Sequence, residues 1–158
     1  MRVGFGFDAH AVDDSRPLVI GGIRIPEGPG LAGHSDADVL CHAVADALLG
    51  AARFGDLGER FPSDDRWEGT SSLEILSQIG VLLREEGWAI ENIDSTVVAA
   101  APRLSPLREE MVRAVAGALE IEPGAVSVKA TTTDGLGFTG RGEGMAAYAV
   151  ALISRVGS

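Results

Sequence analysis

Two short motifs near the N-terminus carry residue types that bind metal ions. Asp8 and His10 are two residues apart in the alternating segment Arg2–His10. Strand periodicity puts both side chains on one face, with Cα atoms about 6.6 Å apart. His42 lies in a helical pattern that begins at Val39. Two imidazoles and one carboxylate are the ligand count of a catalytic zinc site with an open fourth position.

Residue types alone leave other interpretations of these motifs open. A lone Asp-x-His is often a strand end in solvent, and Asp38, His42 and Asp46 at helical spacing also fit a solvated helix face. His34 on the preceding turn would close the metal site as a fourth ligand, which is typical of structural zinc. Beside a helix N-terminus, His34 is instead placed to bind an anion. If the site holds a metal, Asp46 is one turn from His42 and able to orient its ring.

Two further groups of residues suit a phosphorylated, polyhydroxylated ligand. Thr131–Asp134 and the glycine-rich segment Gly135–Gly144 offer hydroxyls, backbone N–H groups and the cation Arg141, which all bind phosphate. Asp56 and the segment Phe61–Asp65 offer carboxylates on loops, which accept hydrogen bonds from ligand hydroxyls. Together with the metal ligands, these groups predict a metal-assisted site for a small phosphorylated molecule.

The periodicities predict the elements that position these groups. Gly4 and Gly6 in the first strand mark a place where another element approaches the backbone closely. Ser35 and Asp38 form a capping-box pattern ahead of the first helix. The order of elements predicts one α+β domain over residues 1–158, with a mixed four-stranded sheet, helices packed on one face and a small hairpin. The predicted elements are strand Arg2–His10, hairpin Leu18–Pro26, helix 39–51, helix Ser71–Glu86, strand Ile90–Ala101, helix Ser105–Leu119, strand Val126–Thr133 and strand Met145–Ser154.

The composition of the chain argues against nucleic acid and membrane as binding partners. Thirteen basic and 23 acidic residues give a net charge of −10, which argues against a nucleic-acid groove. The longest apolar run, Met145–Ile153, is nine residues, far short of the ~20 that cross a membrane. No signal peptide is visible, so a cytoplasmic location is expected. The single cysteine, Cys41, rules out an internal disulfide and is expected in the core. A hydrophobic content of 46% leaves apolar surface for burial between subunits.

These motifs resemble the family of 2-C-methyl-D-erythritol 2,4-cyclodiphosphate synthases. The resemblance implies a lyase of the non-mevalonate (MEP) pathway of isoprenoid synthesis. Its substrate, 4-diphosphocytidyl-2-C-methyl-D-erythritol 2-phosphate, closes by attack of the 2-phosphate on the β-phosphate and releases CMP. The matching motifs are Asp8-x-His10, His34-Ser35-Asp36, His42, Asp56-x-Gly58, Phe61–Asp65, Ala101-Pro102-Arg103, Lys129–Thr133 and Gly137–Gly144, in the family's order from Met1 to about Val156.

The resemblance also implies cofactors, assembly and residue roles. The family is a homotrimer with Zn²⁺ and a second divalent cation, Mg²⁺ or Mn²⁺, in active sites between protomers. By position, the resemblance implies that Asp8, His10 and His42 bind zinc and that Asp134 binds the second metal. It implies His34 and Thr132 as the catalytic pair. The implied substrate-binding residues are Ser35, Asp56, Leu57, Gly58, Phe61, Pro62, Ser63, Asp64 and Asp65 on the sugar side, and Ala99, Ala100, Ala101, Pro102, Arg103, Leu104, Thr131, Thr133, Phe138 and Arg141 on the nucleotide and phosphate side.

The chain departs from the family pattern at four of these positions. Asp134 stands where glutamate is usual, so its carboxylate is one methylene shorter. Ser63 replaces an expected acid, Arg103 replaces the common lysine, and the residue at Ala100 is often larger.

Two other functions share the zinc ligands. A zinc phosphoesterase needs a water path and a general base, and a metal-stapled trimeric binding module needs His34 as a fourth ligand.

Overall fold

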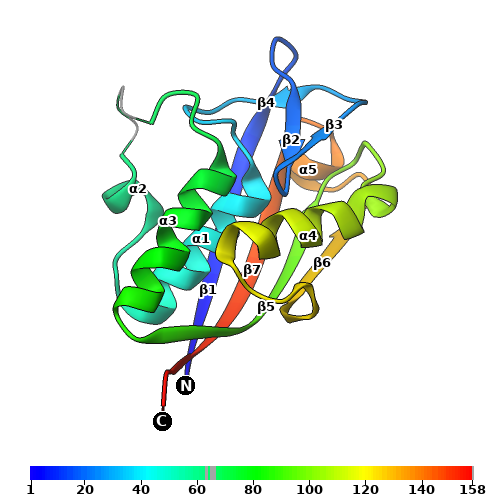
Figure 1. Ribbon diagram of the computed structural model, residues 1–158. Helices are drawn as coiled ribbons and strands as arrows, with labels where there is room; N and C mark the ends of the chain where they lie inside the picture. Colours follow the sequence, from blue (N-terminus) through cyan, green and yellow to red (C-terminus); the bar gives the residue numbers. More distant parts are fainter. Residues whose placement is uncertain (63, 65–66, 158) are drawn as a thin grey trace.

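The computed structural model describes residues 1–62, 64 and 67–157, and its centre is a five-stranded mixed sheet (Figure 1). The strand order is β4-β1-β7-β5-β6, and only β5 and β6 pair in parallel. The nearly continuous apolar strand β7 lies in the middle, as its sequence predicts. The strands are β1 (Arg2–Asp13), β4 (Gly30–Leu31), β5 (Trp88–Val98), β6 (Val126–Thr131) and β7 (Gly144–Arg155).

The helices cover one face of this sheet (Figure 1). A separate hairpin of β2 (Leu18–Ile20) and β3 (Ile23–Ile25) turns at Gly21 and Gly22, which both have positive φ. No described helix is long and apolar enough to cross a membrane. The helices are α1 (Val39–Ala52), α2 (Leu57–Arg60), α3 (Ser72–Glu85), α4 (Arg108–Leu119) and α5 (Gly137–Gly140), with short 3₁₀ turns at Ser105–Leu107 and Pro123–Ala125.

The predicted α+β class, with its mixed sheet and small hairpin, is confirmed. The sheet has a fifth strand in addition to the four predicted. Two residues of β4 pair with Val12 and Asp13, because β1 runs three residues past the predicted end at His10. A two-residue strand leaves no periodicity in the sequence, and for this reason the pattern missed it.

The N-terminus of α1 differs from the predicted capping box. Asp38 is the N-cap, and its carboxylate accepts hydrogen bonds from the N–H groups of Leu40 (3.1 Å) and Cys41 (3.0 Å). The same carboxylate accepts two more from the hairpin turn Gly21–Gly22, at 2.9 and 2.6 Å. Burial raises the pKa of Asp38, and these N–H donors oppose that shift. Asp38 therefore ties the hairpin to α1 and does not belong to the metal site.

Glycines bring β1 and α1 into direct backbone contact. A Cβ on Gly4 would lie 1.8 Å from the carbonyl oxygen of Ala47, and one on Gly6 would lie 1.9 Å from that of Ala43. The element that the strand glycines predict is therefore α1 itself. Since α1 carries His42 and β1 carries Asp8 and His10, this contact sets the distance between the predicted metal ligands.

We expect Gly6→Ala to destabilise the protein by about 2–3 kcal/mol or more, because the new methyl group meets backbone that cannot move without displacing α1. The matched control is Gly50→Ala, in the same helix but exposed and with no atom within 4 Å of the added Cβ. We expect this control to stabilise by about 0.5–1 kcal/mol. Urea unfolding measures both changes. Equal stability of the two variants would contradict the close contact.

The opposite face of β1 and β7 carries large apolar side chains that no other part of the described chain covers. Val3 and Phe5 are 66% and 64% exposed, and Phe7, Tyr148 and Val150 are also exposed. The rings of Phe7 and Tyr148 pack together with centroids 5.0 Å apart. A contiguous apolar sheet face of this kind is typical of a surface that another subunit covers.

Candidate active site

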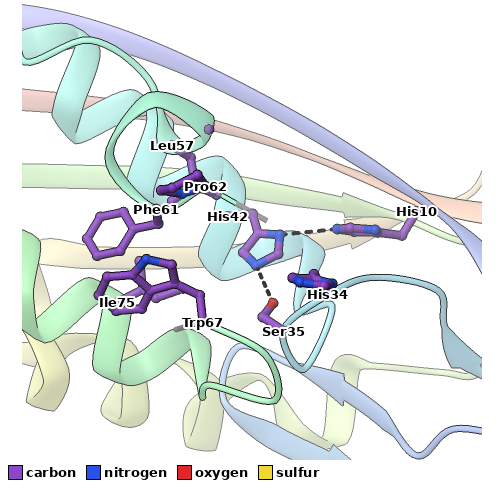
Figure 2. A pocket seen from close by; sticks show the side chains of 10 residues that line it. His10, His34, Ser35, His42, Leu57, Phe61, Pro62, Trp67 and Ile75 are labelled. Atoms are coloured by element: carbon purple, nitrogen blue, oxygen red, sulfur yellow. Dashed lines mark hydrogen bonds between the residues drawn. The ribbon is translucent and has the colours of Figure 1, made fainter. Parts of the chain in front are cut away.

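The three predicted metal ligands converge. Asp8 and His10 leave β1 on the face that packs against α1, and His42 lies in the first turn of that helix. Asp8 Oδ2 is 2.8 Å from His10 Nε2 and 2.9 Å from His42 Nδ1. The two ring nitrogens are 3.1 Å apart, and a dashed line marks this contact in Figure 2. The three ligand atoms therefore form a triangle whose sides are all close to 3 Å.

Contacts within the cluster shift the pKa values of Asp8 and His10. Burial raises the pKa of Asp8, but hydrogen bonds and charge interactions with His10 and His42 outweigh it and hold that pKa well below the usual range. Burial lowers the pKa of His10, and contact with Asp8 outweighs it, so the pKa of His10 is raised. Asp8 is therefore ionised at neutral pH and supplies the negative charge of the cluster.

The donor set fits zinc. Tetrahedral zinc with bonds of about 2.0–2.1 Å places neighbouring ligand atoms about 3.3 Å apart, close to the sides of this triangle. Within the described part of the chain, Asp8, His10 and His42 are the group of acidic, histidine and cysteine side chains that can hold one ion. His34 lies outside this group, so the four-ligand structural site gains no support. Three protein ligands leave a position for a ligand from outside.

The far side of the His42 ring contacts two serines. Its Nε2 lies 3.1 Å from Ser35 Oγ and 3.0 Å from Ser72 Oγ (Figure 2 shows the Ser35 contact). Asp46, which the helical spacing placed next to His42, instead accepts a hydrogen bond from the N–H of Leu57 at 2.7 Å. Asp46 therefore anchors α2, and the two serines contact the His42 ring where the helical spacing predicted Asp46.

A cavity of about 170 Å³ opens beside the metal ligands (Figure 2). The ring of Phe61 packs edge-on against that of Trp67, with centroids 4.8 Å apart. Trp67 and Ile75 were not predicted, because aromatic and aliphatic residues carry no chemical signal in a sequence. The lining residues are His10, His34, Ser35, His42, Leu57, Gly58, Phe61, Pro62, Trp67 and Ile75.

The predicted carboxylates of the sugar side differ in their placement. Asp56 is the N-cap of α2 and accepts from the N–H of Glu59 at 2.8 Å, so it helps to hold the cavity wall. Asp64 follows the cavity residue Pro62 in a turn, where its N–H donates to the Pro62 carbonyl. The predictions for Ser63 and Asp65 lie outside the described residues. Contact of Asp56 or Asp64 with a sugar stays a prediction.

The predicted nucleotide residues gather around a second cavity, of about 390 Å³. Strand β5 ends at Val98, three residues before the predicted end, so Ala100 and Ala101 are exposed and not buried as the strand pattern implied. This early end leaves their backbone free to line a pocket. The cavity is lined by Ala99, Ala100, Ala101, Pro102, Arg103, Leu104, Ser105, Ala130, Thr131 and Thr132.

Asp134 lies in the turn that follows β6. It has a φ of 51°, and its carboxylate accepts a hydrogen bond of 2.9 Å from the Thr132 hydroxyl, so the two side chains are neighbours. Thr133, Asp134 and Phe138 line an adjoining hollow on the apolar face of the sheet. Arg141 is exposed and makes two hydrogen bonds to Glu143, at 2.7 and 3.1 Å. The guanidinium expected to bind phosphate is therefore paired with a carboxylate.

The cavity beside the predicted metal ligands (the metal cavity) and the cavity of the predicted nucleotide residues (the nucleotide cavity) are separate within one chain. They share no lining residue among those described. His10 lies on β1 and Thr131 on β6, and three strand spacings separate these strands. At about 4.8 Å for each spacing, the two strands are about 14 Å apart.

Comparisons with known proteins match this chain to one family over nearly its whole length. Residues 1–154 match the model of the YgbB family. The 2-C-methyl-D-erythritol 2,4-cyclodiphosphate synthase of Pelotomaculum thermopropionicum is 60% identical over 99% of this chain and 98% of that protein. The structure of the bifunctional IspDF from Campylobacter jejuni has a TM-score of 0.93 at 41% identity, over 98% of this chain and 42% of that one. Plasmodium falciparum IspF in a CDP complex gives 0.85 at 28% identity, over 98% and 96% of the two chains.

Proposed function

Because this chain belongs to the YgbB family of 2-C-methyl-D-erythritol 2,4-cyclodiphosphate synthases, we propose that its metal cluster and the adjoining cavity are the active site for this cyclisation. The chain is a lyase of the MEP pathway. The substrate is 4-diphosphocytidyl-2-C-methyl-D-erythritol 2-phosphate, and the products are the cyclodiphosphate and CMP. The convergence of Asp8, His10 and His42 beside a cavity, in a chain 60% identical to a synthase, carries the proposal.

Phosphorus NMR of the protein with this substrate, Zn²⁺ and Mg²⁺ tests the activity. The expected result is equal amounts of CMP and cyclodiphosphate. Release of inorganic phosphate from the 2-position would instead indicate a zinc phosphoesterase.

Zinc is the proposed occupant of the cluster, on the basis of its two imidazole nitrogens and one carboxylate oxygen. When bound, it supplies a Lewis acid for the β-phosphate. His34 and Ser35 line the same cavity and are placed to donate hydrogen bonds to phosphate oxygens. The side chains of Leu57 and Phe61 cover the carbon skeleton and exclude water.

The proposed reaction requires little proton transfer by the protein's side chains. The attacking 2-phosphate is already anionic at neutral pH and belongs to the same molecule as its target, so the protein's contribution is to fold the substrate into a reactive geometry. Thr132 is the proposed donor to the phosphate oxygens, which then replace Asp134 as the acceptor of its hydroxyl proton. The segment 99–104 is the proposed cytidine site. The CDP complex of the P. falciparum relative supports a cytidine nucleotide as ligand.

The second cation, Mg²⁺ or Mn²⁺, is proposed to lie at Asp134. We expect Asp134→Asn to raise the Mg²⁺ or Mn²⁺ concentration needed for half-maximal activity, because the amide removes the charge that attracts the cation. Asparagine tolerates the left-handed backbone at this position, so the variant keeps the turn. A titration of each metal measures the shift, and Asp134→Glu, the residue common in the family, is the matched control. An unchanged titration in Asp134→Asn would show that the residue is not a ligand.

A homotrimer with sites between protomers is proposed for the assembly. The exposed face formed by Val3, Phe5, Phe7, Tyr148 and Val150 supplies the apolar surface for an interface. The separation of the metal and nucleotide cavities supports a site completed by the next subunit. The cytoplasmic location stays a prediction.

A further inference from the structure

The metal-distal nitrogen of His42, Nε2, contacts Ser72, a polar residue that the proposed reaction does not use. We propose that Ser72, held by Asp36, is a positioning residue that fixes the proton of His42 on Nε2 and so keeps Nδ1 available to the metal. This inference rests on the proposed metal centre. It concerns the residues behind the ligand and not the ligand itself.

Ser72 is held from two directions. It is the first residue of α3 and is only 1% exposed. Its backbone N–H donates to Asp36 Oδ2 at 2.9 Å, and its hydroxyl donates to Asp36 Oδ1. Asp36 is itself tied to the loop, because its N–H donates to the Thr70 carbonyl at 3.3 Å and its Oδ1 accepts from the N–H of Asp38 at 3.3 Å. The Ser72 oxygen therefore has a fixed position, 3.0 Å from His42 Nε2.

The direction of these hydrogen bonds determines the tautomer of His42. A serine hydroxyl has one proton and two lone pairs, and an ionised carboxylate only accepts. Because the Ser72 proton is committed to Asp36, the Ser72 oxygen turns a lone pair toward His42. The Nε2 atom must then carry the ring proton and donate it. In the neutral ring that binds an ion, Nδ1 then offers its lone pair to the ion, in place of the 2.9 Å contact that it makes with Asp8 Oδ2.

Ser35 touches the same nitrogen but does not determine the tautomer. Its oxygen lies 3.1 Å from His42 Nε2 and accepts from the N–H of Ala37 at 3.2 Å. No carboxylate holds its hydroxyl proton among the described residues, so that proton is free to turn either way. Ser72 is therefore the serine whose orientation is fixed.

The arrangement extends the usual carboxylate–histidine–metal pairing by one hydroxyl. Partners of this kind orient the ring and raise the basicity of the ligating nitrogen, and their loss costs about 10- to 100-fold in metal affinity. No pattern in the sequence pointed to Ser72, because α3 reads as a packing helix. Its first residue meets His42 only when the chain has folded.

The test compares Ser72→Ala with Ser71→Ala. Ser71 is the N-cap of α3, and its hydroxyl accepts from the N–H of Leu73 at 3.3 Å without contact to His42. Both variants lose a hydrogen bond at the same helix end, so a merely structural effect appears in both. Competition with a chromophoric chelator measures the Zn²⁺ dissociation constant, and ¹⁵N NMR of the imidazoles reports which nitrogen of His42 carries the proton.

We expect Ser72→Ala to bind Zn²⁺ at least about 10-fold more weakly and to lose the slowly exchanging Nε2 proton signal of His42. Ser71→Ala should match the wild type in both measurements, and Ser72→Thr should restore both. If Ser72→Ala fails to fold, Asp36→Ala should weaken zinc binding in the same direction, since it removes the acceptor that orients Ser72.

Two results separate this inference from the metal centre on which it rests. Wild-type zinc affinity and an unchanged His42 signal in Ser72→Ala would overturn the role of Ser72 and leave the metal centre intact. Failure of the wild type to bind zinc would overturn the metal centre, and the role of Ser72 with it.

Discussion

His42→Ala is expected to abolish stoichiometric zinc binding and to lower synthase activity at least about 1,000-fold, while the fold survives. A bound metal contributes several kcal/mol to stabilising charge in a transition state, and each 1.36 kcal/mol is a factor of ten in rate. His42 supplies one of three ligand atoms that converge within about 3 Å, so its loss leaves two. The core of α1 around it consists of apolar side chains that do not depend on the imidazole.

The matched control is His34→Ala. His34 lines the same cavity but lies outside the ligand group, so this variant should lose activity and keep its zinc. Metal analysis after dialysis, phosphorus NMR and circular dichroism measure zinc, turnover and fold separately. One zinc for each chain in His42→Ala would contradict the assignment, and loss of zinc in His34→Ala would bring back the closed four-ligand site.

The three residues of the proposed metal cluster could be picked out in the sequence because each of them obeys a local periodicity. Asp8 and His10 share a strand face, and His42 follows a helix start, so residue type and spacing marked them as candidates, and the resemblance to the family selected them over a solvated surface. Their meeting was not predictable from spacing, because it depends on Gly4 and Gly6 allowing α1 to lie directly on β1. The sequence marked those glycines as a close approach without identifying the element that approaches.

Contacts between distant segments account for what the sequence missed. Ser72 and Asp36 are 36 positions apart and meet only in the folded chain. Asp38 fits a capping box with Ser35 in the sequence, but in the structure Asp38 itself caps the helix, and the hairpin turn supplies two further N–H donors to its carboxylate. A local sequence pattern contains no information about a hydrogen-bond partner on another element. For acidic and hydroxyl residues of this kind, a prediction from sequence therefore names the wrong partner or none.

A mixture of two inactive variants is expected to recover activity if the active site is shared between protomers. His42→Ala removes a zinc ligand, and Thr132→Ala removes a hydroxyl from the nucleotide cavity, about 14 Å away across the sheet by three strand spacings. A head-to-tail ring joins two different surfaces, so in the proposed trimer the metal cavity of one subunit can face the nucleotide cavity of the next. Unfolded together in equal amounts and refolded, the variants should give about a quarter of sites with both halves intact.

The fraction follows from independent choice at each interface. One half of the subunits carry an intact metal cavity, and one half of their neighbours carry an intact nucleotide cavity, so about a quarter of wild-type activity should return. Native mass spectrometry verifies mixed trimers, and each variant refolded alone is the control. Burial of the exposed apolar face of β1 and β7 would favour assembly, but it does not determine which cavities lie next to one another. Mixed trimers as inactive as their parents would therefore place both halves of each site within a single chain, and a monomer at all concentrations would remove the shared site altogether.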